Sequence, residues 1–120
     1  MAGQNAKGFK RLLNASRFSL AGFKAVWQHE EAFRQEVLLL SISTPFALWL
    51  GENKLEKLAL IGSIVLVMLI ELLNSAIEAI VDRIGLEHHE LSGRAKDIGS
   101  ATVSLSLVWA TIVWTYILLD

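Results

Sequence analysis

The sequence predicts an all-α membrane protein made of one domain, with an N-terminal amphipathic helix on the membrane surface and three membrane-spanning helices. Hydrophobic residues make up 53% of the 120 residues, and the chain has one proline and no cysteine. Such a composition is too apolar for an ordinary small soluble domain. The absence of cysteine excludes disulfides, thiol nucleophiles and thiolate metal sites. The net charge of −1 gives no support for nucleic-acid binding.

The first predicted element is a surface helix over about residues 6–28. Its apolar residues recur at helical spacing, and its basic residues lie mostly off that stripe. The stripe consists of Phe9, Leu12, Leu13, Leu20, Phe23 and Trp27. This pattern is typical of a basic helix that lies in the interface and is attracted to anionic lipids. The alternative is a soluble helix packed on a partner.

Three apolar stretches follow, at about 32–50, 57–84 and 98–119. The first is short, and it contains Pro45. A polar loop over 85–97 is predicted between the second and third spans. Basic residues gather before the first span and in this loop, so the positive-inside rule places both in the cytoplasm and the C-terminus outside. No cleavable signal is evident, so we expect the protein to stay in the membrane that it enters.

A polar face on the second span is the main functional signal. At about 100° per residue, Glu71, Asn74, Ser75, Glu78 and Asp82 fall on one side of the helix. A carboxylate costs about 2.5–3.5 kcal/mol at the centre of a spanning helix, so such groups face a protein interior or a wet cavity. We therefore interpret the face as a site. Two alternatives are wet carboxylates at the membrane edge and hydrogen bonds that hold helices together.

The chemistry that this face favours is phosphoryl transfer with Mg²⁺. Carboxylates near the cytoplasmic interface are suitable ligands for the ion, Lys96 can balance phosphate charge, and a further carboxylate can accept a proton. A lipid alcohol is the expected acceptor. No Gly-rich phosphate loop occurs. His88 and His89 lack the spacing of a helical zinc site, and spacing alone favours solvated surface acids for Glu30 and Glu31. A proton or cation pathway, and a silent adaptor or small pore, remain the alternatives on physical grounds.

Three stretches carry a resemblance to a known family: Glu71-x-Leu73-Asn74-Ser75-Ala76-Ile77-Glu78-x-x-Val81-Asp82, Phe33-Arg34-Gln35-Glu36, and Glu90 to Asp97. They resemble the prokaryotic diacylglycerol kinases, and the similarity covers nearly the whole chain. The resemblance implies a homotrimer in the bacterial inner membrane that transfers the γ-phosphate of MgATP to the hydroxyl of diacylglycerol, giving phosphatidic acid. Some relatives phosphorylate undecaprenol instead, but the diacylglycerol branch is the closer match.

The resemblance also implies roles for individual residues. Glu71 matches the catalytic base, Glu30 and Glu78 match the metal-binding acids, and Asn74 and Asp82 have supporting roles. The matching nucleotide-binding positions are Arg11, Phe18, Glu30, Glu78, Glu87, His88, His89, Lys96 and Asp97. The matching lipid-binding positions are Arg11, Ala15, Ser16, Arg17, Ser19, Ala32, Phe33, Arg34, Gln35, Glu36, Glu71 and Ser100.

Two positions depart from the family pattern. Phe18 stands where close relatives often have tyrosine, so a hydroxyl contact is absent there. Glu31 beside Glu30 leaves open which acid reaches the metal. The homotrimer agrees with a physical argument, because one chain offers Glu71 and Glu78 too few partners to shield them from lipid. We therefore expect a site built between subunits.

Overall fold

The computed structural model describes residues 7–119, which form four α-helices and no strand. The helices are α1 (Phe9–His29), α2 (Glu31–Leu50), α3 (Lys54–Ile84) and α4 (Glu90–Leu118). The all-α class is confirmed. The predicted start of the first helix, at residue 6, lies outside the described residues.

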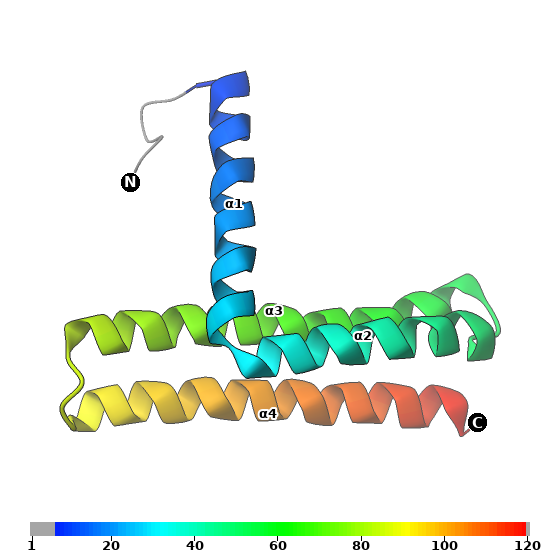
Figure 1. The fold of residues 1–120 in the computed structure, drawn as a ribbon. Coiled ribbons are helices and arrows are strands. Elements are labelled where there is room, and N and C mark those ends of the chain that lie inside the picture. Colours follow the sequence, from blue (N-terminus) through cyan, green and yellow to red (C-terminus); the bar gives the residue numbers. More distant parts are fainter. Residues whose placement is uncertain (1–6, 120) are drawn as a thin grey trace.

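Helices α2, α3 and α4 form a bundle, and α1 projects sideways from it (Figure 1). Helices α2, α3 and α4 lie side by side, with α3 antiparallel to both neighbours. Helix α2 lies beside only the N-terminal part of α3, because its 20 residues are shorter than the 31 of α3. Helix α1 leaves the bundle sideways where α2 begins. This level therefore marks where α1 meets the bundle.

The break between α1 and α2 is a single residue. Glu30 has extended backbone angles (φ −120°, ψ 104°), and it is both the C-cap of α1 and the N-cap of α2. One extended residue is enough to change the helix direction, and it places the Glu30 side chain in the corner between the two helices.

Among the helices in residues 7–119, α3 and α4 are the two that are long and apolar enough to cross a membrane. The bundle has a small core of Ile64, Val67 and Ala110, with Leu40 and Trp114 packed against it. Most other large apolar side chains are exposed. The hydroxyls of Thr44, Ser63, Thr102, Ser106 and Thr111 donate to carbonyls of their own helices. These bonds satisfy polar groups that water cannot reach in lipid.

The loop predicted over 85–97 is too long, because α4 begins at Glu90. The Nδ1 atom of His89 accepts a hydrogen bond from the backbone N–H of Leu91 at 3.1 Å, which caps the helix. Glu90 adds an acidic side chain in the first turn, where the helix dipole favours negative charge. Lys96 and Asp97 therefore lie on a helix, not on a loop.

Candidate active site

The polar face of α3 is divided between two environments. Glu71 and Asn74 are buried, with exposed fractions of 4% and 9%. Glu78 is half-buried and Asp82 is exposed. Ser75, Glu78 and Asp82 line a cavity of about 770 Å³ between α1 and α3. The predicted face thus has one edge inside the bundle and one edge in the cavity.

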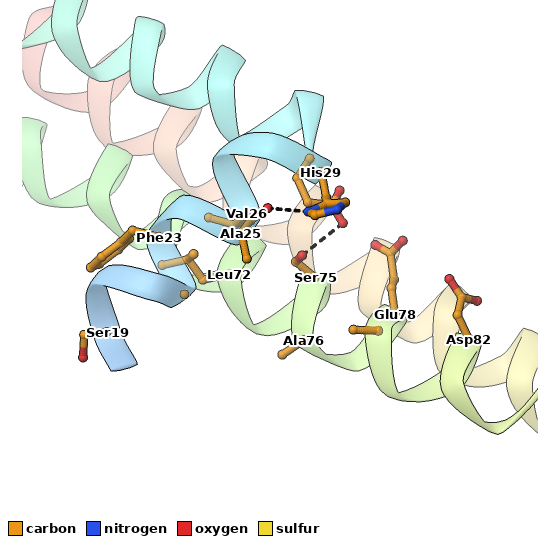
Figure 2. Close-up of a pocket in the computed structure, with 13 residues that line it drawn as sticks. Ser19, Phe23, Ala25, Val26, His29, Leu72, Ser75, Ala76, Glu78 and Asp82 are labelled. Carbon is orange, nitrogen blue, oxygen red and sulfur yellow. Dashed lines mark hydrogen bonds between the residues drawn. The ribbon is translucent and has the colours of Figure 1, made fainter. Parts of the chain in front are cut away.

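Figure 2 shows this cavity, with Glu78 and Asp82 on the same side of α3. The wall opposite α3 comes from the C-terminal half of α1, where Ser19, Phe23 and His29 contribute side chains. Cavities of about 300–1,000 Å³ are typical of small-molecule sites. The space therefore suits a ligand that approaches at the level where α1 meets the bundle.

Glu30 joins this site from the corner between α1 and α2. The Ser75 hydroxyl donates to Oε1 of Glu30 at 3.0 Å, and Glu30 is half-buried on the cavity wall. The interpretation of Glu30 as a solvated surface acid, made from spacing alone, is therefore wrong. Glu31 is exposed at the start of α2, so Glu30 is the acid of this pair that reaches α3.

Several carboxylates interact across this region. Glu71 lies within electrostatic range of Glu30 and Glu78, and Glu36 lies within range of Glu71. Asn74 donates from Nδ2 to Oε1 of Glu78 at 2.9 Å. Like charges placed this closely repel each other unless a cation or a proton balances them. The cluster is therefore suited to bind a cation and to accept a proton.

Lys96 lies further along the bundle. Its Nζ is 2.7 Å from Oδ1 of Asp82, and this ion pair joins α4 to α3 on a half-exposed surface. Three other predicted residues lie close to Lys96 in the sequence and are exposed: Glu87, His88 and Asp97. Lys96 also lies within electrostatic range of Glu78. The structure thus places a cationic group next to Asp82 and near the Glu78 side of the acid cluster.

The start of α2 contributes a mixture of buried and exposed predicted residues. Phe33 and Glu36 are buried, with exposed fractions of 5% and 8%, whereas Gln35 is exposed. Arg34 donates from Nη1 to the carbonyl of Trp27, which fixes the corner between α1 and α2. The remaining predicted residues are Ala32, which is half-buried, and Ser100, which is exposed on α4.

The N-terminal half of α1 is not brought to the acids. Arg11 is 19 positions before Glu30, which corresponds to about 28 Å of helix, and α1 projects away from the bundle (Figure 1). The predicted residues in this half are Arg11, Ala15, Ser16, Arg17 and Phe18, all exposed. Their contacts with nucleotide or lipid stay predictions.

Sequence reasoning missed two residues of this region. His29 lines the cavity and donates from Nδ1 to the carbonyl of Ala25 at 2.9 Å. Gly99 of α4 lies against Asn74. The only sequence signal for His29 was its place next to Glu30. No sequence signal pointed to Gly99, because its contact with Asn74 depends on how α3 and α4 pack.

The acids on the cavity can hold a divalent metal only together with ligands from a substrate. Within residues 7–119, no group of three His, Cys, Asp or Glu side chains is arranged to hold a metal ion by itself. Mg²⁺, however, is commonly bound by one or two carboxylates together with substrate phosphates and water. Glu30 and Glu78 supply two hard oxygen donors on one cavity, so they fit an ion that arrives with a nucleotide.

The fold and the site define the class of the protein as a membrane protein with an acid-rich site at one level of its helical bundle. The chain belongs to the prokaryotic diacylglycerol kinase family, whose family model matches residues 17–118. It is 48% identical over 114 residues to the diacylglycerol kinase of Escherichia coli K12, covering 95% of this chain and 93% of the relative. It is also 51% identical over 111 residues to that of Haemophilus influenzae, covering 92% and 94%. A third relative, the diacylglycerol kinase of Pseudomonas aeruginosa, is 49% identical over 112 residues, covering 93% and 91%.

Proposed function

We propose that the protein is an ATP-dependent diacylglycerol kinase, which transfers the γ-phosphate of MgATP to the free hydroxyl of diacylglycerol and releases phosphatidic acid and ADP. The observation that carries the proposal is the meeting of Glu30, Glu71 and Glu78 at the level where the surface helix joins the bundle. A lipid headgroup lies at this level in a membrane. The names of the relatives support the same acceptor.

Glu71 is the proposed catalytic base. The acceptor hydroxyl oxygen forms a bond to the γ-phosphorus while the bond from that phosphorus to the bridging oxygen of ADP breaks. The hydroxyl proton passes to the Glu71 carboxylate. A buried carboxylate is suited to this role because it has few water molecules to displace before it accepts the proton.

Glu30 and Glu78 are the proposed ligands of Mg²⁺, held in place by Ser75 and Asn74. When bound, the ion neutralises phosphate charge and orients the transferring group. Lys96 is the proposed phosphate contact of the nucleotide, with Asp97, Glu87, His88 and His89 around it. Arg11 and Phe18 complete the proposed nucleotide set.

The proposed lipid site is the cavity edge at the corner between α1 and α2. Ser19 lines the cavity, and Phe33 and Glu36 are buried at the start of α2. The other proposed contacts are Arg11, Ala15, Ser16, Arg17, Ala32, Arg34, Gln35 and Ser100. Apolar and polar groups side by side suit a molecule with acyl chains and a hydroxyl headgroup.

The proposed assembly is a homotrimer in the bacterial inner membrane, with α2 as the first of three spans. The N-terminus and residues 85–97 then face the cytoplasm, where ATP is available, and the C-terminus faces the periplasm. The distribution of basic residues supports this orientation.

The test is transfer of labelled γ-phosphate from MgATP by purified protein in micelles, to dioleoylglycerol and to undecaprenol in parallel. We expect label on dioleoylglycerol, its loss in Glu71→Gln, and its retention in the control Glu52→Gln, an exposed acid in the turn between α2 and α3. Label on undecaprenol alone would show that the acceptor is undecaprenol and not diacylglycerol. No label on either lipid from folded protein would overturn the kinase proposal, and proton flux would be measured next.

A further inference from the structure

Gly99 of α4 lies against the side chain of Asn74 on α3. A Cβ atom built on Gly99 would be 2.0 Å from Oδ1 of Asn74 and 3.1 Å from its Cγ. The third-nearest atom is Cβ of Asn74, at 3.9 Å. Across the described residues, the three atoms nearest to this Cβ thus all belong to Asn74, whose side chain occupies the space left by the missing methyl group.

The orientation of the Asn74 carboxamide is fixed by its two ends. Nδ2 donates to Glu78, while Oδ1 is buried with no hydrogen-bond partner in the described residues and points at Gly99. Turning the amide over would place its oxygen against the Glu78 carboxylate, which repels it. Gly99 thus leaves space for Oδ1 of Asn74, and the NH₂ group of Asn74 can then face Glu78.

We infer that Gly99 is a positioning residue for the reaction, which holds the Asn74 carboxamide against Glu78 by leaving room for its oxygen. A methyl group at this position is accommodated most cheaply by rotating the Asn74 side chain, since the clashing atom is the far end of a flexible side chain. That rotation costs little in stability, but it removes the hydrogen bond that orients Glu78. The inference rests on the proposed role of Glu78 as a metal ligand.

The first test is Gly99→Ala. Groups that orient metal ligands typically change metal affinity or activity by about 10- to 100-fold when they are altered. We expect kcat to fall by about this factor, with a weaker apparent affinity for Mg²⁺ and an unchanged KM for diacylglycerol. Gly62→Ala is the matched control, because nothing lies within 4 Å of a Cβ atom at this glycine of α3.

A double-mutant cycle separates this role from simple helix packing. In Asn74→Ala the nearest atom to a Cβ on residue 99 is at 3.9 Å, an ordinary contact. Gly99→Ala should then cause no further loss of kcat and no loss of melting temperature, because the Asn74 atoms that it displaces are already gone and alanine is the better helix former. An additive loss in the double variant would show that Gly99 acts on packing and would overturn the inference.

The hydrogen bond itself can be followed without activity. The side-chain ¹⁵N–¹H₂ signals of Asn74, assigned by their loss in Asn74→Ala, report the bond to Glu78. We expect these signals to shift in Gly99→Ala and to stay in place in Gly62→Ala. Unchanged signals with normal activity would overturn the inference. A wild-type protein that phosphorylates no lipid would instead overturn the proposed function, while the NMR result would still decide the Gly99–Asn74 contact.

Discussion

At the residue scale, the acids of the site depend on neutral side chains that hold them. Ser75 fixes Glu30 and Asn74 fixes Glu78, and both partners lie on the face of α3 that helical periodicity identifies. Hydrogen bonds to charged groups contribute about 1.5–3 kcal/mol, more than those between neutral groups. The short polar residues between the acids are therefore part of the proposed site.

Ser75→Ala is expected to reduce kcat by about 10-fold or more, with a weaker apparent affinity for Mg²⁺, because Glu30 loses the hydroxyl that holds it over the cavity. Ser75→Thr retains a hydroxyl and should restore most of the activity. The measurement is the lipid kinase assay over a Mg²⁺ titration. Ser41→Ala is the control, since that exposed hydroxyl bonds only to the carbonyl of Val37 on its own helix. Equal losses in the Thr and Ala variants would show that Ser75 acts by its size.

At the element scale, hydropathy and helical periodicity were enough to predict the helices but not all of their ends. The first helix, the break before α2 and the polar face of α3 follow from the residue pattern. The start of α4 was missed because histidine is an uncommon N-cap, so His89 gave no signal for a helix beginning at Glu90.

Contacts between helices were beyond prediction from the residue pattern. The approach of Glu30 to Ser75, and of Gly99 to Asn74, depends on how whole helices are placed. Spacing predicts which residues share a face, but the partner of that face is decided by packing. This explains why the acids of α3 were identified from the residues alone, whereas Glu30 was first interpreted as a surface residue.

Trp114 provides a test of the packing between α3 and α4 that is independent of the active site. Its Nε1 donates to the carbonyl of Leu60 at 3.0 Å and lies 3.1 Å from the Ser63 hydroxyl. Trp114→Phe should lower the free energy of unfolding by about 0.6 kcal/mol, the average for hydrogen bonds between helices in membranes, and by about 1.7 kcal/mol at most. Activity should be unchanged. The measurement is unfolding in mixed micelles, with Trp109→Phe, half exposed on the same helix, as the control. A loss of activity without a change in stability would contradict this role.

At the scale of the whole molecule, a single chain exposes more surface than a compact protein of its mass. Its accessible surface is 9128 Å², against about 6,500 Å² expected for a compact monomer of this mass. Most large apolar side chains outside the small core contribute to this excess. Lipid covers such surface in a membrane, and so do further copies of the chain.

The spacing of the charged groups adds a separate reason to expect copies. Lys96 pairs with Asp82, which is eleven positions after Glu71 on α3, a separation of about 16 Å along the helix. The proposed base Glu71 and the proposed phosphate contact Lys96 would have to act on the same bound nucleotide and acceptor. Within one chain Lys96 pairs with Asp82 and not with Glu71, so we expect a neighbouring chain to complete the site.

Mixed oligomers test this expectation directly. Glu71→Gln and Lys96→Ala subunits should each be inactive alone. If the two residues act from different chains, co-assembly of the two variants in equal amounts should recover about a quarter of wild-type activity, because about one site in four then combines an intact Glu71 with an intact neighbouring Lys96. If both act from the same chain, every site in the mixture retains one defect and no activity returns. Mixtures of each variant with wild-type protein control for assembly, since they should retain activity in proportion to their intact sites.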